Sequence, residues 1–158
     1  MFEQNGKPSL NGWTFHPAIP GDTANFDDTA PPGSGGTWSI KLHKADAPHT
    51  TNNVTEGFTN LTSGIYELSS WLMTKYEGFA GPASTQGWIA VIRSRNGMGD
   101  TLRAFAGSDT NWHELDLFDT LSLVPTDSVI LELSAAATDT STHGNPMWFD
   151  DVTFKKIP

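Results

Sequence analysis

Short stretches of alternating apolar and polar residues recur along the chain, separated by clusters of Gly, Pro, Asn and Asp. Such alternation is typical of half-buried β-strands, because successive side chains of a strand point to opposite faces of a sheet. No long segment has a helical period. Phe2 and Glu3 are expected to form a short edge strand. The other predicted strands are Trp13–Phe15, Trp38–His43, Val54–Asn60, Gly64–Lys75, Gly87–Arg95, Leu102–Gly107, Trp112–Phe118, Ser128–Ala135 and Met147–Lys155.

Several of these strands have one face that is more apolar than the other. The predicted core faces are Tyr66/Leu68/Ser70/Leu72, Leu115/Leu117 and Val129/Leu131/Leu133. Trp71 is then expected on the opposite side of its strand, where it would face solvent or a ligand. The stretch Trp88–Ile92 is apolar on both faces. It therefore predicts a central strand that is covered on both sides or lines a cleft with one face.

The loops are predicted from Pro, Gly and polar clusters at residues 30–36, 45–49, 78–82 and 137–146. Strands at this spacing predict an all-β fold, a two-sheet antiparallel β-sandwich of the jelly-roll type. The chain of 158 residues is long enough for a core and has no visible internal repeat or linker. We therefore expect residues 1–158 to form a single domain, excised from a larger protein because strand-like residues follow Met1 directly.

Composition excludes several classes of function. A formal net charge of −9 argues against a nucleic-acid-binding protein, which needs clustered Lys and Arg. The chain has no Cys, so disulfides and thiolate chemistry are excluded, and no apolar run is long enough to span a bilayer. A charged fraction of only 17%, with six Trp, suits neutral polar ligands such as sugars. It is equally typical of extracellular β-sandwiches that contact other proteins.

Two adjacent carboxylates, Asp150 and Asp151, interrupt the apolar residues of the last predicted strand. Because a strand alternates its faces, at least one of them points the same way as buried neighbours. A buried ionised carboxylate is costly unless it is hydrogen-bonded, paired or bound to a metal. The partner is therefore expected to be a cation, a backbone amide, or a lysine such as Lys41 or Lys155.

A set of short motifs is similar to those of one family over nearly the whole chain. Gly36–Leu42 resembles a Gly-x-x-Ser-Leu-Lys-Leu strand, and Ser63–Trp71 resembles a Gly-x-Tyr-x-Leu-Ser-x-Trp strand. Trp148–Phe154 is similar to a closing Tyr-Ile-Asp-Asp-Val strand. Phe2-Glu3 with Gly12-Trp13 and Asn111-Trp112 match further positions. In this order, the motifs resemble the jelly-roll carbohydrate-binding modules of bacterial cellulases and xylanases, within the galactose-binding-domain-like superfold.

The resemblance implies a structural Ca²⁺ where the first and last strands meet. Its implied ligands are Glu3, Asp150 and Asp151, completed by carbonyl groups and a carboxylate from the 22–36 loop. Asp22, Asp27 and Asp28 are candidates for that carboxylate. The chemistry fits, because Ca²⁺ takes six to eight oxygen ligands. The five His are scattered without ligand spacing, which disfavours zinc.

Sugars stack their apolar C–H faces on aromatic rings while their hydroxyls meet amides, carboxylates and guanidinium groups. The candidates for a site on a concave sheet face are Trp71, Trp88, Tyr76, Phe79, Gln86, Arg93, Arg95 and Glu67. Both arginines have an alternative role in surface ion pairs. A site in the end loops would instead draw on Trp38, His43, His49 and His143. Trp13, Trp112 and Trp148 match family positions that are structural.

The expected function is a non-catalytic carbohydrate-binding module that attaches a larger secreted or surface protein to a polysaccharide. We expect it to be a monomer outside the bacterial cell, with no nucleic-acid partner and no insertion into a membrane. The alternative is a protein-contact or adhesion domain of a bacterial surface protein. An enzyme is disfavoured, because no catalytic motif is visible and outward acids on strands are normally solvated surface. A pair of carboxylates for glycoside hydrolysis remains conceivable among Glu67, Glu114, Asp116 and Glu132.

Overall fold

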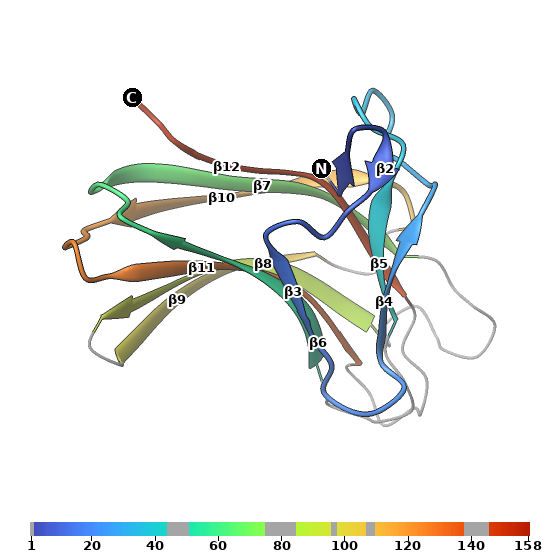
Figure 1. Ribbon diagram of the computed structural model, residues 1–158, viewed down its shortest axis with the longest axis horizontal. Helices are drawn as coiled ribbons and strands as arrows, with labels where there is room; N and C mark the ends of the chain where they lie inside the picture. The colour runs from blue at the N-terminus through green and yellow to red at the C-terminus, as the bar shows by residue number, and fades with distance from the viewer. Residues whose placement is uncertain (1, 44–50, 75–84, 96–97, 107–109, 138–145) are drawn as a thin grey trace.

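The computed structural model describes residues 2–43, 51–74, 85–95, 98–106, 110–137 and 146–158 (Figure 1). These residues form strands and no helix, so the described part of the chain contains no helix that could cross a membrane. The strands are β1 (Glu3–Gln4), β2 (Lys7–Pro8), β3 (Trp13–His16), β4 (Thr23–Asp27), β5 (Ser39–His43), β6 (Thr51–Thr59), β7 (Gly64–Thr74), β8 (Thr85–Arg95), β9 (Met98–Ala106), β10 (His113–Leu121), β11 (Ser128–Ala137) and β12 (Met147–Lys156).

Two antiparallel five-stranded sheets pack face to face and form a β-sandwich. The first sheet has the strand order β10-β7-β12-β5-β4, and the second has the order β3-β6-β11-β8-β9. The predicted fold class is confirmed. In Figure 1 both layers bend in the same direction, and β8 arches so that its hollow side faces away from the first sheet. We call the outward surface of the β3-β6-β11-β8-β9 sheet the concave face.

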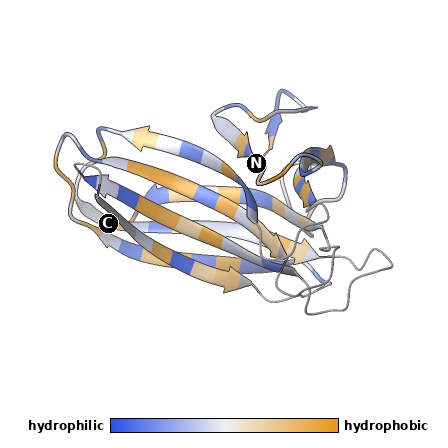
Figure 2. Ribbon diagram, turned by 90° about the horizontal axis from the view of Figure 1, so that it is seen from below, coloured by the Kyte–Doolittle hydropathy of each residue, from blue (hydrophilic) through white to orange (hydrophobic). Residues whose placement is uncertain are grey.

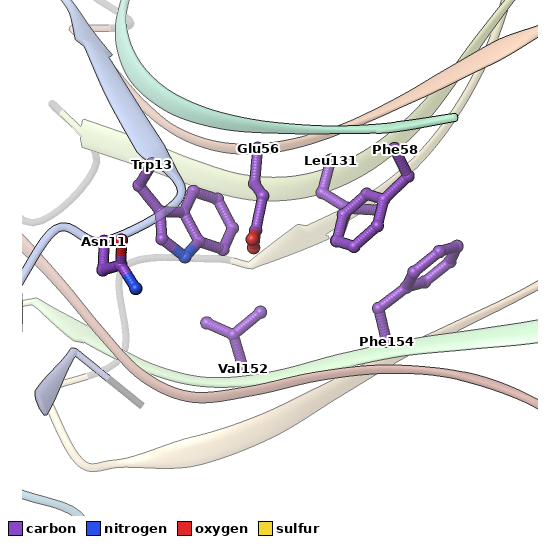
Figure 3. A pocket seen from close by; sticks show the side chains of 7 residues that line it. All are labelled: Asn11, Trp13, Glu56, Phe58, Leu131, Val152 and Phe154. Carbon is purple, nitrogen blue, oxygen red and sulfur yellow. The ribbon is translucent and has the colours of Figure 1, made fainter. Parts of the chain in front are cut away.

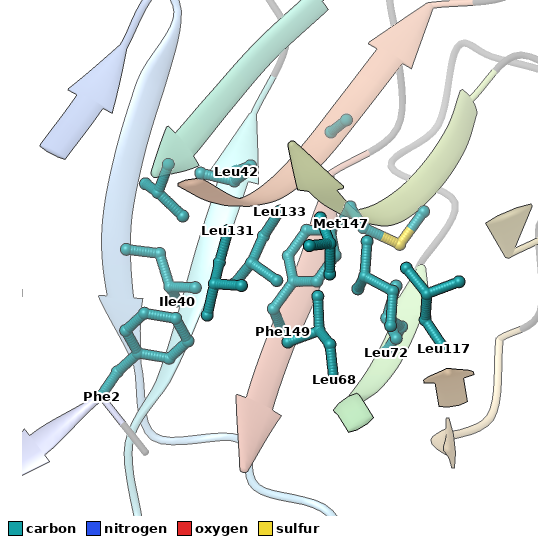
Figure 4. Close-up of a cluster of buried hydrophobic side chains, with 14 of the residues drawn as sticks. Phe2, Ile40, Leu42, Leu68, Leu72, Leu117, Leu131, Leu133, Met147 and Phe149 are labelled. Atoms are coloured by element: carbon teal, nitrogen blue, oxygen red, sulfur yellow. The ribbon is translucent and has the colours of Figure 1, made fainter. Parts of the chain in front are cut away.

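The core lies between the two sheets and is built from the inward positions of each strand (Figure 4). It contains the predicted face Tyr66, Leu68 and Leu72 of β7 and the predicted face Val129, Leu131 and Leu133 of β11. Figure 2 shows the alternation of hydrophobic and hydrophilic residues along the strands that produces this arrangement. Each large side chain buried here contributes about 1.5–3 kcal/mol.

The N-terminal segment differs from its prediction. Phe2 is not in a strand but is fully buried in the core, with its ring 5.5 Å from that of Trp13. The short hairpin β1–β2 follows, and Asn5 and Gly6 at its turn have φ angles of 54° and 74°. A two-residue hairpin turn of this kind needs positive φ at both positions, which Asn and Gly adopt most readily.

Strand β4 was not predicted, because Thr23–Asp27 stands in a segment that was expected to be a loop, although Ala24 and Phe26 alternate there with polar residues. Its backbone pairs with β5 over its full length, from Thr23 opposite His43 to Asp27 opposite Ser39. The strand lies at the edge of its sheet, where few side chains need to be apolar. Ala24 and Phe26 pack against the core, so the short alternation of this segment and its pairing with β5 agree.

Candidate functional site

The concave face carries an aromatic pair formed by Trp88 of β8 and Phe105 of β9. Ile89 and Val91 point into the core, so alternation turns Trp88 outward. Trp88 lies directly opposite Phe105 in the register of the two strands. Their ring centroids are 5.8 Å apart with an interplanar angle of 53°, and Phe105 is 54% exposed. An aromatic surface of this size is thus available to a ligand.

Glu132 of β11 holds the indole of Trp88 in place. The Trp88 Nε1–H donates a 2.8 Å hydrogen bond to Glu132 Oε1, and the Ser134 hydroxyl donates to the same oxygen at 2.8 Å. The Asn53 side-chain amide donates to Glu132 Oε2 at 3.3 Å. Three donors on three different strands therefore fix one carboxylate, which in turn orients the aromatic ring.

Polar side chains flank the aromatic pair on the same face. The guanidinium of Arg103 lies over the Trp88 ring, 5.9 Å from its centroid. Farther across the sheet, His16 Nε2 and Thr55 Oγ1 are 2.8 Å apart. The face thus combines an aromatic platform with carboxylate, amide, hydroxyl, imidazole and guanidinium groups. This set can stack against a sugar ring and hydrogen-bond its hydroxyls.

The structure divides the candidates that the sequence placed on one sheet face. Gln86 and Trp88 share the concave face, because they are two residues apart on β8. Trp71 and Glu67 lie on β7, on the outward surface of the other sheet, where Glu67 pairs with Lys155 at 2.9 Å. The grouping of Trp71 with Trp88 is therefore wrong. Strands β7 and β8 are consecutive but belong to different sheets, so their outward positions end on opposite surfaces.

Arg93 and Arg95 occupy the same alternation as the buried Val91 and so do not point onto the concave face. Arg95 makes a bidentate ion pair with Asp127, with distances of 3.0 Å from Nε to Oδ1 and 2.7 Å from Nη2 to Oδ2. This pairing holds the pKa of the Asp127 carboxyl below its usual value. Arg93 donates a 3.5 Å hydrogen bond to the Ser122 carbonyl. Both arginines therefore secure the turn that precedes β11, as in the alternative reading of the sequence.

The remaining sugar-site candidates are only partly placed. Tyr76, Phe79, His49 and His143 lie outside the described residues. Trp38 and His43 are half-buried, and His43 ends strand β5. Because His49 and His143 lie outside the described residues, the end-loop alternative stays a prediction.

Several residues of the concave face were not among the sequence-based candidates: His16, Asn53, Thr55, Arg103, Phe105 and Ser134. Glu132 had been considered as an outward acid and as a possible member of a catalytic carboxylate pair, but not as part of a sugar site. A signal for Phe105 was present, since it lies three residues into a predicted strand in which Leu102 and Ala104 occupy the opposite face. The pairing of β9 with β8, which places Phe105 beside Trp88, is not readable from the sequence.

The carboxyl group of Asp150 is buried on the outward side of β12, opposite Trp71. Asp150 has no exposed surface, and burial, together with the charge of Asp151, raises its pKa to about 6. Its Oδ1 accepts a 2.7 Å hydrogen bond from the Asp151 amide, and its Oδ2 accepts a 3.5 Å hydrogen bond from the Ser34 hydroxyl. Asp151 has a φ of 45° and stands at a β-bulge, where the register shifts between Asp150 and Thr153.

One loop connects Asp150 with the first strand. Ser34, which bonds Asp150, also donates to the Gly36 carbonyl at 3.3 Å. The neighbouring Thr37 donates its backbone amide to Glu3 Oε2 at 2.9 Å. Two carboxylates therefore flank a short loop that offers carbonyl and hydroxyl oxygens. These oxygen donors fit a calcium ion chemically, with Glu3, Asp150 and the loop carbonyls as its ligands.

The other candidate metal ligands do not join this group. Asp22 Oδ2 accepts hydrogen bonds from the backbone amides of Ala18 at 2.8 Å and Ile19 at 3.2 Å, which stabilises a turn. Asp28 is exposed. Within the described ranges, no three His, Asp or Glu side chains cluster as metal ligands. The expected convergence of three or more carboxylates is therefore not observed in that part of the chain.

The lysines proposed as partners of the Asp pair have other contacts. Lys155 pairs with Glu67, and the Lys41 ammonium lies 4.7 Å from the ring centroid of Trp148. Trp148 is almost fully buried, which supports the structural role expected of it.

No family model matches the sequence, and no curated protein sequence matches it. Solved structures with the same fold are found at low identity. TmCBM61 in complex with β-1,4-galactotriose has a TM-score of 0.61 and 11% identity, covering 94% of this chain and 90% of that one. The CBM22-1 xylan-binding domain from Paenibacillus barcinonensis Xyn10C has a TM-score of 0.59 and 14% identity, covering 96% and 89%.

A third similar structure is the enzymatically active domain of tailspike protein 4 of bacteriophage CBA120. Its TM-score is 0.69 at 13% identity, and the match covers 99% of this chain. This chain spans only 21% of that one. At such identities the likeness shows the fold alone, which is the fold of known carbohydrate-binding modules.

Proposed function

We propose that this protein is a non-catalytic carbohydrate-binding module whose ligand lies on the concave face. The observation that carries the proposal is the pairing of the half-buried Trp88 with the exposed Phe105, held by the hydrogen bond from Trp88 to Glu132. An aromatic surface fixed by a satisfied carboxylate is preformed. Binding therefore requires little reorganisation of the protein.

The geometry favours a single glycan chain over a flat crystalline surface. The two rings are tilted by 53° and so do not form one plane. A twisted chain can place the apolar face of one sugar on Trp88 and an edge of the next against Phe105. Structures of the same fold include one bound to β-1,4-galactotriose and one named as xylan-binding, so neutral β-linked glycans are the ligands to test first.

The charge balance of the concave face supports a neutral ligand. Glu132 and Arg103 contribute opposite charges beside Trp88, and hydroxyl and amide groups extend toward β3. We further propose that the domain acts as a monomer outside the cell, as the binding part of a larger protein. The weakly charged, Trp-containing composition supports that setting.

We also propose that a calcium ion stabilises the fold beside Asp150. The support is a fully buried carboxylate with few hydrogen bonds and a second carboxylate, that of Glu3 in β1, which contacts the same loop. A divalent cation there would offset the cost of keeping Asp150 ionised. Its role would be structural, on the opposite side of the molecule from the concave face.

The test measures binding to a panel of soluble β-glucans, xylans, mannans and galactans, with affinity gels and Trp fluorescence as the two readouts. We expect at least one glycan in the gel to slow the migration of the native protein. The Trp88→Ala variant should migrate as it does in a gel without glycan. Trp71→Ala is the matched control, because it removes an indole from the other sheet. No binding across the panel, with self-association or capture of a protein instead, would favour the protein-contact alternative. Release of reducing sugars by the purified protein would establish an enzyme.

A further inference from the structure

One exposed cation of the concave face has donor groups to spare. Arg103 is exposed on β9, the strand that also carries Phe105. Within the described ranges, Arg103 makes no hydrogen bond or ion pair, and its guanidinium lies 5.9 Å from the ring centroid of Trp88. That distance is close to the outer limit of a cation–π contact, so the ring holds the guanidinium only weakly. The N–H groups of Arg103 are therefore available to a ligand.

The pairing of the strands places Arg103 beside the aromatic surface. Arg103 and Phe105 are two residues apart on β9, so they share one face at a spacing of about 7 Å along the strand. Ala90 lies opposite Arg103 on one side and opposite Glu132 on the other. The Cα atoms of Arg103 and Glu132 are therefore two strand spacings apart, about 10 Å. Ala90 has no exposed surface, so the larger side chains around it close the floor of the site.

We propose that Arg103 determines which sugar binds, by donating two parallel hydrogen bonds to adjacent hydroxyl oxygens of the sugar that stacks on Trp88. This role rests on the proposed glycan-binding function. The guanidinium presents its N–H groups in a planar fork that matches two acceptors side by side. Adjacent hydroxyls of a sugar ring offer such a pair of oxygens, and their directions differ between epimeric sugars. A fork beside an aromatic ring therefore distinguishes sugars that stack equally well.

The charges around the site favour hydroxyls over a carboxylate as the acceptors. An acidic sugar is the other class of glycan that a guanidinium recognises in this way. Glu132 lies on the same face, where its carboxylate would repel that of a uronic acid. The chain as a whole has a formal net charge of −9, which adds to the repulsion. A neutral pair of hydroxyls accepts the same two hydrogen bonds without this cost.

The aromatic cluster between the two sheets does not offer the same chemistry (Figure 3). It surrounds Glu56, whose pKa is raised by burial. The ring centroid of Phe154 lies 5.4 Å from that of Phe58 and 5.1 Å from that of Tyr66, so these rings pack against one another. None of the described residues that line this space is an arginine. Recognition of sugar hydroxyls is therefore assigned to the concave face.

The test compares the native protein with Arg103→Lys and Arg103→Met by calorimetry, using β-1,4-linked oligosaccharides of glucose, mannose, galactose and xylose. Glucose and mannose differ only in the direction of one hydroxyl, so the ratio of their dissociation constants reports hydroxyl recognition. Both variants should bind the preferred oligosaccharide roughly 10- to 100-fold more weakly and lose most of the native preference among the four. Lysine keeps the charge but not the fork. Arg93→Lys is the matched control, because Arg93 does not point onto the concave face.

Three results would overturn this role of Arg103. The first is native affinity and preference in Arg103→Lys, because the charge alone would then suffice. The second is an equal loss for all four oligosaccharides, because Arg103 would then bind without selecting. The third is tighter binding of an oligogalacturonate that weakens between roughly 0.05 M and 0.5 M NaCl, as expected for an ion pair.

Melting temperatures control for folding and should be nearly unchanged in every variant, because Arg103 is exposed. A native protein that binds none of the oligosaccharides overturns the role of Arg103, and failure across the wider glycan panel overturns the proposed function as well. Binding that is lost in Trp88→Ala but retained with native preference in both Arg103 variants overturns the role of Arg103 alone. The two failures are thus distinguishable.

Discussion

The indole of Trp88 is tied to Glu132 by a 2.8 Å hydrogen bond between neighbouring strands of the concave face. This contact decides which way the largest aromatic residue of that face presents its ring. Glu132 Oε1 also accepts from Ser134, so the anchoring carboxylate is itself held in place. The arrangement makes the concave face a rigid surface and leads to specific expectations for its variants.

The first prediction concerns Phe105. Phe105→Ala should weaken glycan binding about tenfold or more, equivalent to about 1.4 kcal/mol, because half of the aromatic surface is removed. Stability should hardly change, since Phe105 is 54% exposed. Leu102→Ala is the control: Leu102 is 40% exposed on the same strand but alternates to the other side. Equal loss of affinity in both variants, measured by calorimetry, would contradict the assignment of the concave face.

A second prediction concerns Glu132. Glu132→Ala leaves the Trp88 Nε1–H and the Asn53 amide without their acceptor, which should reduce the free energy of unfolding by about 1–3 kcal/mol. Glu132→Gln keeps one acceptor oxygen and should be intermediate. Denaturant titrations rank the free energies of unfolding of the native protein and the two variants. The Trp emission spectrum reports whether the Trp88 indole is released. If Glu132→Ala is as stable as the native protein, the carboxylate does not hold Trp88.

A third prediction separates the two arginines of β8. Arg95→Lys should destabilise the protein more than Arg93→Lys, because lysine cannot reproduce the bidentate contact with Asp127. The pKa of Asp127 is lowered in the folded state, so the pair stabilises the fold above the unfolded pKa of about 3.9. That stabilisation should disappear as the pH falls below this value. Glycan affinity should remain unchanged in both variants, which native gels containing the ligand can establish.

A fourth prediction uses the raised pKa of Glu56. The folded protein holds the Glu56 proton more tightly than the unfolded chain, whose pKa is about 4.3. The contribution of Glu56 to the free energy of unfolding is therefore largest below the unfolded pKa. It is lost as the pH rises through the folded pKa. Glu56→Gln should raise the melting temperature at pH 7 but not below about pH 4. Because protonated Glu56 and Gln are both neutral, melting curves of the two proteins should converge in acid.

A fifth prediction tests calcium. Addition of EGTA should lower the melting temperature, and Ca²⁺ should restore it, by the mass-action effect of a ligand that binds only the folded state. Asp150→Asn should abolish the response. Asp22→Asn should lower stability by weakening its turn yet preserve the calcium response, because its Oδ2 caps two backbone amides. If neither EGTA nor Ca²⁺ changes the melting curve of the native protein, the calcium site beside Asp150 does not exist.

The sequence by itself determined the fold class and the faces of the central strands. Alternation at Tyr66–Leu72 and Val129–Leu133 identified core positions correctly, because a period of two is a local property of an extended chain. The β4 strand was missed, because the alternation of Ala24 and Phe26 spans only five residues in a segment rich in Asp, Gly and Pro. Burial of Asp150 was likewise readable from its apolar neighbours.

Only the tertiary structure decided which outward residues share a surface. Trp71 and Trp88 are both outward aromatics, but the chain crosses from one sheet to the other between β7 and β8. Phe105 joins Trp88 and Glu132 supports it because β9 and β11 flank β8, a neighbour relation that no local pattern encodes. The same holds for Glu56, which meets Val152 and Phe154 across the sandwich. Sheet order depends on long-range backbone hydrogen bonds, and these bonds assemble the concave face.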